Sequence, residues 1–187
     1  MCKFDPKVYW EDRGADYSVK ADTTPELENL ATIIETRRLV DILEVGSGYG
    51  RLYDYLVNQR GYDCNYQMCD FVGSFIQGCK ERTGILPDLW DGKTLPYEDD
   101  SFKLVVSFSV ALHVPPGKIL AFLKEHHRVC QDKLFLATWY VEGKAPCVQE
   151  YCFHHDYPAL FEEAGFVVSD EKSFRIARKN WLLEKIT

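Results

Sequence analysis

Three glycines in one short turn are the first residues whose spacing could do chemistry. Gly46, Gly48 and Gly50 follow the apolar run 39–45 directly and precede a segment with helical spacing. Glycines in a turn between a strand and a helix let backbone N–H groups approach a ligand closely. Alone, this GxGxG spacing is weak, because a dinucleotide fingerprint prefers GxGxxG and glycines also serve turns for conformation only. The case for a ligand site at this turn therefore depends on which other residues the fold would bring near it.

Acidic residues stand at intervals that would bring them to that turn. Glu44 precedes it, Asp70 follows the second apolar run, and Asp91 with Gly92 follows the third. In a doubly wound sheet these positions lie at the carboxyl ends of neighbouring strands, where ligands bind. Asp70 can accept hydrogen bonds from both ribose hydroxyls, and Asp91 can accept a hydrogen bond from an adenine amino group. The pattern predicts a site for an adenosine-containing ligand.

The elements that must position these residues alternate between strand and helix. Strands are expected at 39–45, 65–69, 85–89, 103–109 and 133–139, and helices at 24–38, 51–60, 73–82, 117–129 and 157–165. Alternation of this kind predicts an α/β fold with a doubly wound, mostly parallel, seven-stranded sheet. The last two apolar runs, 166–169 and 181–186, have no helix between them and should pair as an antiparallel C-terminal hairpin.

Composition narrows the classes of protein. A chain of 187 residues with 46% hydrophobic residues predicts one domain with a full core, and 22 basic against 29 acidic residues give a net charge of −7, which disfavours nucleic acid as a partner. The longest apolar stretch, 104–114, is short of the roughly 20 residues that span a bilayer. The start at Met1 lacks the apolar run of a signal peptide, and the seven cysteines are expected as thiols. We expect a cytoplasmic protein without a membrane partner, in an oligomeric state that the sequence leaves open.

Several segments together resemble the class I S-adenosylmethionine-dependent methyltransferases. They are the run Asp41–Arg51, Asp70, the segment Asp91–Tyr97, and Ser101–Ser107 followed by His113-Val114. The resemblance implies a Rossmann-like fold, S-adenosylmethionine as methyl donor and S-adenosylhomocysteine as product. Lys103 and the segment 130–133 depart from the family pattern, but neither falls at an expected ligand contact.

The same resemblance implies roles for individual residues. The methionine part of the donor would lie against Glu44, Gly46, Ser47 and Gly48. Asp70 would hold the ribose, Phe71 would pack on adenine, and Asp91 with Gly92 would read the adenine edge. Ser107 and Phe108 would lie by the sulfonium.

Methyl transfer is an in-line displacement, in which positioning lowers the barrier and a base is needed only for a protonated acceptor. His113, after the fourth strand, is the candidate base, with a helix cap as its structural alternative. The amino-terminal segment that holds Tyr9, Trp10, Arg13 and Tyr17 could be a lid over the cofactor or an amphipathic cover on the edge of the sheet. The candidate substrate residues are Tyr9, Trp10, Arg13, Tyr17, Trp139, Tyr140, His154 and His155.

Cys147, Cys152, His154 and His155 form the one cluster with ligand-like chemistry. Their spacing is not usual for zinc, so no metal is expected.

These observations predict a single methyltransferase domain over residues 1–187. Within it, 1–38 form an N-terminal lid and helix region, 39–140 the cofactor-binding core, and 141–187 a substrate loop with the C-terminal helix and hairpin. The predicted function is methyl transfer to an oxygen or nitrogen of a small-molecule acceptor, with a peptide or protein acceptor open. The alternatives are an NAD(P)-dependent oxidoreductase on a similar fold and a non-catalytic cofactor-binding module for a partner protein.

Overall fold

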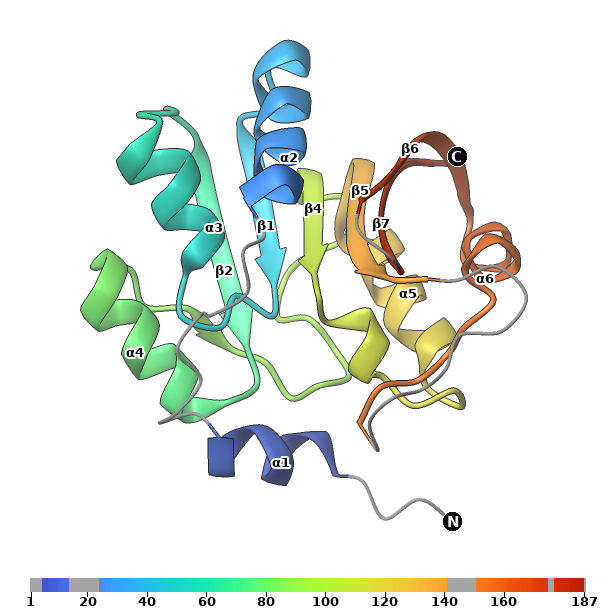
Figure 1. Cartoon of the computed structure of the whole chain (residues 1–187), viewed down its shortest axis with the longest axis horizontal. Helices are drawn as coiled ribbons and strands as arrows, with labels where there is room; N and C mark the ends of the chain where they lie inside the picture. Colours follow the sequence, from blue (N-terminus) through green and yellow to red (C-terminus); the bar gives the residue numbers. More distant parts are fainter. Residues whose placement is uncertain (1–4, 14–23, 141–150, 175–176, 187) are drawn as a thin grey trace.

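A seven-stranded sheet forms the centre of the computed structural model, which describes residues 5–13, 24–140, 151–174 and 177–186. The strand order is β3-β2-β1-β4-β5-β7-β6, with β1 to β5 parallel, β7 antiparallel to β5, and β6 antiparallel to β7 (Figure 1). The strands are β1 (Asp41–Val45), β2 (Asn65–Asp70), β3 (Asp88–Leu89), β4 (Phe102–Phe108), β5 (Cys130–Trp139), β6 (Phe166–Ser173) and β7 (Arg178–Lys185). The predicted doubly wound sheet with an antiparallel C-terminal hairpin is confirmed.

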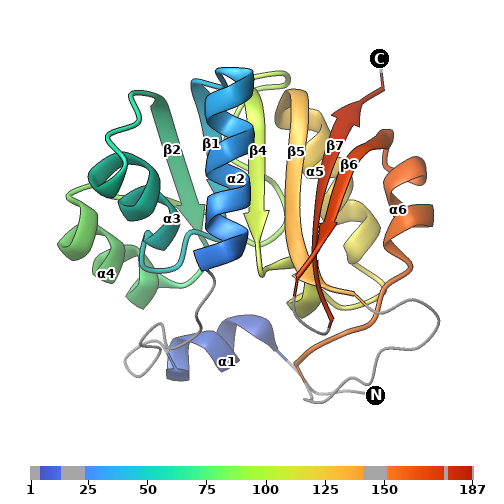
Figure 2. The same cartoon turned by 45° about the horizontal axis from the view of Figure 1, so that its top comes forward.

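Helices cover both faces of this sheet (Figures 1 and 2). One face carries α2 (Thr24–Arg37), α3 (Arg51–Tyr53), which continues as the π-helical η1 (Asp54–Gln59), and α4 (Gly73–Thr83), and the other carries α5 (Ile119–Val129) and α6 (Tyr157–Glu163). Leu30 of α2 packs with Leu104 on the first face, and Phe161 of α6 packs with Val105 on the second. Because the central strands are buried on both faces, they read as continuous apolar runs in the sequence.

The C-terminal strands are longer than predicted. β6 extends to Ser173 and β7 begins at Arg178, whereas the sequence indicated 166–169 and 181–186. β6 lies at the edge of the sheet, and of its residues only Phe166 is buried. An edge strand with polar residues on both faces carries little hydrophobic periodicity, which is why its full length was missed.

A short helix at the amino end, α1 (Pro6–Arg13), was not predicted. The Asp5 carboxylate accepts the backbone N–H of Lys7 at 2.9 Å and that of Val8 at 3.4 Å, which caps its first turn. α1 lies across the edge of the sheet where β1 and β4 end (Figures 1 and 2). There the backbone N–H of Gly73, at the start of α4, donates to Glu11 Oε1 at 3.1 Å. Eight residues span about two turns, too few to show a clear helical period in the sequence.

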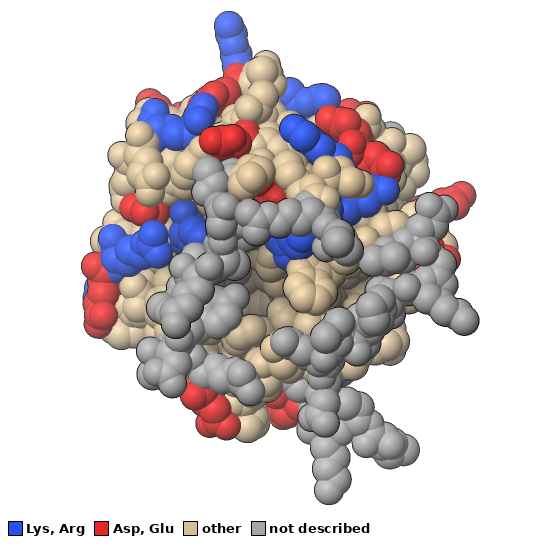
Figure 3. All heavy atoms as spheres, in the orientation of Figure 1, with Lys and Arg blue, Asp and Glu red and all other residues tan. Residues whose placement is uncertain are grey.

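The surface agrees with the mixed composition. Lysine and arginine side chains alternate with aspartate and glutamate over the face seen in Figure 3, and they do not gather into one basic patch there. Among the described residues, no helix is long and apolar enough to cross a membrane.

Candidate functional site

The glycine turn after β1 adopts a backbone that glycine favours. Gly46, Gly48 and Gly50 have φ angles of 78°, 55° and 71°. A Cβ atom on Gly46 would collide with Val110, whereas one on Gly48 would meet no atom within 4 Å. The turn therefore packs tightly against the segment after β4, while Gly48 faces open space.

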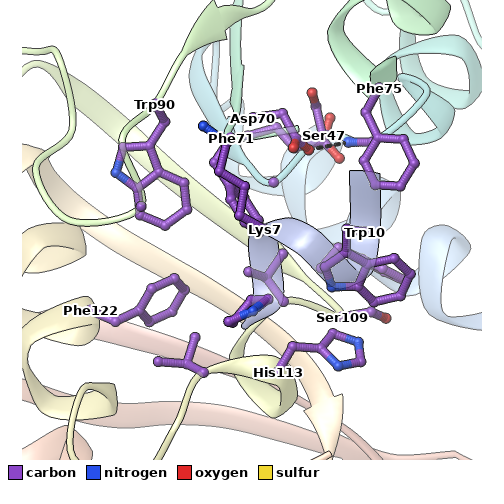
Figure 4. A pocket seen from close by; sticks show the side chains of 18 of the residues that line it. Lys7, Trp10, Ser47, Asp70, Phe71, Phe75, Trp90, Ser109, His113 and Phe122 are labelled. Carbon is purple, nitrogen blue, oxygen red and sulfur yellow. Dashed lines mark hydrogen bonds between the residues drawn. The ribbon is translucent and has the colours of Figure 1, made fainter. Parts of the chain in front are cut away.

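That open space is a cavity of about 920 Å³ at the carboxyl ends of the parallel strands. Its volume lies within the roughly 300–1,000 Å³ usual for small-molecule sites. The walls come from α1, the glycine turn, the end of β2, residues 90–94, the end of β4 and α5. Figure 4 shows Ser47, Asp70 and Phe71 on one side, Trp10, Ser109 and His113 opposite, and Trp90 with Phe122 at one end.

Asp70 is fixed at the end of β2. The backbone N–H of Gly48 donates to its Oδ2 at 2.8 Å, and that of Val72 donates to its Oδ1 at 2.9 Å. The residue is 3% exposed, and this burial raises the pKa of its carboxyl to about 6. A carboxylate offers about four lone-pair directions, so acceptor capacity remains for ligand hydroxyls. The structure thus places Asp70 beside the glycine turn, as the sequence predicted.

Glu44 lines the cavity from the end of β1 and is also 3% exposed. Burial raises the pKa of its carboxyl to about 8, although the Tyr66 hydroxyl donates to Glu44 Oε2 at 2.9 Å and favours the ionised form. At pH 7 the side chain is mainly neutral in the free protein. A cationic group bound beside it would favour the carboxylate, so this wall suits a ligand that carries positive charge.

Aromatic rings close one end of the cavity. Phe71 and Trp90 meet edge to face with ring centroids 6.0 Å apart, and Trp90 lies 6.2 Å from Phe122 of α5. Stacking and edge contacts of this kind suit a flat heterocycle. Trp90 was not singled out from the sequence, although its place directly before Asp91 would have been a signal.

Asp91 and Gly92 line the same end of the cavity, but the Asp91 side chain is exposed. Its Oδ1 accepts the backbone N–H groups of Lys93 and Thr94, both at 2.8 Å, and these hydrogen bonds lower the pKa of the carboxyl. The carboxylate therefore shapes its own turn in the free protein. Reading of an adenine edge by Asp91 stays a prediction.

The end of β4 differs in detail from the prediction. Phe108 lines the cavity together with Ser109 and Val110, whereas Ser107 is fully buried and is not part of the cavity wall. Side chains alternate across a strand, so Ser107 lies on the same face as Val105, in the core beneath α5 and α6. The expectation that Ser107 lies by the sulfonium does not fit this placement.

His113 ends the 3₁₀ turn η2 (Ala111–His113) and lines the cavity. Its Nδ1 lies 2.8 Å from the carbonyl oxygen of Tyr151, so Nδ1 carries the proton and Nε2 is an acceptor. The ring meets Trp10 of α1 edge-on, with centroids 4.9 Å apart. Burial, aided by the positive charge of Arg178, lowers the pKa of His113 to about 4. The side chain is neutral at pH 7 and a weaker base than an ordinary histidine.

The candidate substrate residues near the amino terminus differ in their position relative to the cavity. Trp10 forms part of the cavity wall, and Tyr9 packs on Tyr151 with ring centroids 4.3 Å apart. Arg13 ends α1, and Tyr17 lies outside the described residues. The cavity is also lined by residues that sequence reasoning did not select, among them Lys7, Arg51, Phe75, Trp90, Ser109, Val110 and Phe122.

The four candidates near the end of β5 do not reach the cavity wall. Trp139 is 40% exposed, His154 is exposed, and Tyr140 packs on Trp181 at 5.1 Å between ring centroids. His155 is buried beside Tyr157, with the two ring centroids 5.3 Å apart. The aromatic cluster between α6 and β7 holds Tyr140 and His155, so neither lines this cavity, and their part in an acceptor pocket stays a prediction.

Across the described ranges, no group of three or more histidine, cysteine, aspartate or glutamate side chains could hold a metal ion. Cys147, one member of the cluster noted in the sequence, lies outside those ranges.

Comparison with known proteins agrees with this geometry. A protein family described as a methyltransferase domain matches residues 42–133. A comparison with curated proteins found no match.

Solved structures share the fold. Magnesium protoporphyrin IX methyltransferase from Synechocystis PCC 6803, crystallised with S-adenosylhomocysteine, is 13% identical, with a TM-score of 0.76 over 97% of this chain and 98% of that one. A methyltransferase from Aquifex aeolicus is 18% identical, with a TM-score of 0.70 over 98% and 100% of the two chains. A sarcosine dimethylglycine methyltransferase assigned in Galdieria sulphuraria is 15% identical, with a TM-score of 0.73 over 87% and 86%.

The matched family and the fold identify the chain as a class I S-adenosylmethionine-dependent methyltransferase. The expected family and methyl donor are thereby confirmed, and the alternative of an NAD(P)-dependent oxidoreductase is set aside.

The residues present fit the donor. Gly48 leaves open the space that a Cβ atom would enter, Glu44 is a buried carboxyl that a cation would ionise, and Asp70 keeps acceptor capacity for hydroxyls. When bound, S-adenosylmethionine supplies a methyl group on a positively charged sulfur. Glu44 and the glycine turn would hold its methionine part, Asp70 its ribose, and Phe71 with Trp90 its adenine.

Proposed function

We propose that the chain transfers the methyl group to an oxygen or nitrogen of a small-molecule acceptor. The observation that carries this proposal is the wall opposite Asp70, where Trp10, Ser109 and His113 line the same cavity beneath α1. This part of the cavity lies beyond the residues that fit the donor and is enclosed by aromatic side chains. Such a space suits a small, partly apolar molecule.

His113 would orient the acceptor and would not act as a strong base. Its Nδ1 proton is directed to the Tyr151 carbonyl oxygen, so Nε2 can accept a hydrogen bond from an acceptor hydroxyl or N–H. A pKa of about 4 suits this role better than removal of a proton from an ammonium group. The favoured acceptor therefore arrives with its lone pair already free, and the site lowers the barrier by alignment.

The position of α1 supports a small acceptor over a protein surface. Trp10 packs between Phe75 and His113, and Glu11 accepts the N–H of Gly73, so α1 is attached on both sides of the cavity. We propose that α1 is the lid of a single methyltransferase domain and that it moves when substrates exchange. A lid of this kind limits the access of water to the reacting groups.

The test is a screen of metabolite pools with a donor that carries an isotope-labelled methyl group. The pools are separated by mass into small molecules, peptides and proteins, and a parallel reaction uses Asp70→Asn. The proposal predicts label in the small-molecule fraction with the wild-type chain and much less with the variant. Label confined to proteins would indicate a protein acceptor, and a wild-type chain that binds S-adenosylhomocysteine but labels nothing would indicate a non-catalytic module.

A further inference from the structure

Arg178, the first residue of β7, joins three elements behind the acceptor side of the cavity. Its Nε donates to Glu26 Oε1 of α2 at 2.7 Å, and its Nη2 donates to Ser109 Oγ at 3.0 Å. The ion pair is largely buried, with side-chain exposures of 15% for Arg178 and 6% for Glu26. Arg178 is not one of the residues that line the cavity, so its influence there passes through Ser109 and its neighbours.

Ser109 holds an unfavourable backbone conformation. Its φ angle is 64°, in the left-handed region that residues other than glycine rarely adopt. Its backbone N–H donates to the carbonyl oxygen of Ala137 in β5 at 2.7 Å, and its hydroxyl accepts from Arg178. Such conformations persist where surrounding contacts determine them, and they gather at functional sites. Here the determining contacts come from β5 and from Arg178.

This conformation sets the course of the chain that faces the acceptor. After Ser109 the backbone turns into η2, so Val110 meets the glycine turn at Gly46 and His113 reaches the cavity. Before Ser109, the Phe108 ring has the Arg178 guanidinium carbon 5.8 Å from its centroid and that of Arg51 at 5.3 Å. Arg178 therefore contacts both residues at the bend.

We propose that Arg178, held by Glu26, is a positioning residue for methyl transfer: it fixes the Phe108–His113 segment against the glycine turn. This inference rests on the proposed function, because the segment is the wall assigned to the acceptor. It also gives the antiparallel β7 a role in the site. Arg178 would touch neither the donor nor the acceptor.

The positive charge of Arg178 offers an independent readout. It is among the causes that lower the pKa of His113, together with burial, while the hydrogen bond to the Tyr151 carbonyl oxygen acts in the opposite direction. Removal of the charge with the contacts of Tyr151 and Trp10 left in place should raise the pKa of His113. This titration reports the charge of Arg178 at His113, and hydrogen exchange at Ser109 reports the restraint on the backbone separately.

The experiment compares Arg178→Gln and Arg178→Lys with the wild type. Lys179→Gln is the matched control, because Lys179 is the next residue of β7 and also pairs with a carboxylate, Glu171, at 2.9 Å. In Arg178→Gln we expect hydrogen exchange at the Ser109 amide to quicken about ten-fold or more, since the bend loses a restraint. The pKa of His113, followed by NMR of labelled histidine, should rise, and the Kd for S-adenosylhomocysteine should stay within about three-fold. In Arg178→Lys the exchange should quicken while the pKa of His113 stays low.

Ser109→Gly keeps the inference testable if Arg178→Gln does not fold, because glycine tolerates the left-handed conformation. It should fold normally and also show faster exchange at residue 109. With an acceptor in hand, both variants should lower kcat about ten-fold or more at an unchanged KM for the donor. The inference would be overturned if Arg178→Gln matched the wild type in all three readouts: the exchange rate of the Ser109 amide, the pKa of His113 and kcat. Exchange and titration need no acceptor, so an acceptor screen without product would reject the proposed function and leave this inference to be decided separately.

Discussion

Binding of S-adenosylhomocysteine at pH 7 should release a proton from Glu44. In the free protein the pKa of this carboxyl is about 8 because it is buried, so roughly nine-tenths of it is protonated at pH 7. In the complex the ammonium of the methionine part would lie against the carboxylate and bring its pKa well below 7. The expected release is therefore about 0.8 proton per ligand at pH 7 and about 0.1 at pH 9, where Glu44 is already ionised.

Calorimetric titrations in buffers of different ionisation enthalpy measure this release. Glu44→Gln is the matched variant, because it keeps the shape and the contact with the Tyr66 hydroxyl but cannot ionise. Asp70, with a pKa of about 6, adds only about 0.1 proton at pH 7 in both proteins. Equal proton release by wild type and Glu44→Gln at pH 7 would refute the reasoning.

Three further predictions concern the same cavity. Asp70→Asn should weaken S-adenosylhomocysteine binding by about 2–3 kcal/mol, through loss of charge-assisted hydrogen bonds, and calorimetry showing unchanged affinity would reject the ribose assignment. Glu44 has a raised pKa in the folded protein, so its stabilising contribution is complete below its ordinary pKa of 4.5 and is lost as the pH rises through 8. The free wild type should lose about 3 kcal/mol of unfolding free energy between pH 6 and 9 that Glu44→Gln keeps, as denaturant titrations would report. His113→Ala should lower kcat more than donor affinity; unchanged turnover would remove it from the acceptor site.

Much of the fold follows from local sequence patterns. Buried parallel strands read as apolar runs, and the glycines after β1 are required by a backbone with positive φ angles. The parts that were missed lack a local signal. α1 is too short to show a period, and β6 is an edge strand with polar residues on both faces.

The donor side of the site could be predicted because its residues occupy strand ends, which topology brings together. Glu44, Asp70 and Phe71 all line the cavity as expected. The acceptor side depends on contacts between distant segments. The Ser109 hydroxyl accepts a hydrogen bond from Arg178, which lies 69 residues away in the chain, and no spacing in the sequence indicates this pair.

The same limit applies to the aromatic residues at the end of β5. Trp139 and Tyr140 are aromatic residues at a strand end, which favours a ligand site in the sequence. In the structure the second of them packs into the cluster of Tyr157 and Trp181, because a core that can bury an aromatic ring is stabilised by doing so.

The most direct test of the central assignment is a crystal structure of the chain grown with S-adenosylhomocysteine. The assignment predicts the nucleoside in the cavity with its adenine against Phe71 and Trp90, its ribose hydroxyls on the Asp70 carboxylate, and its amino-acid part beside Gly48 and Glu44. A ligand bound elsewhere, or a cavity that stays empty at saturating ligand, would contradict it.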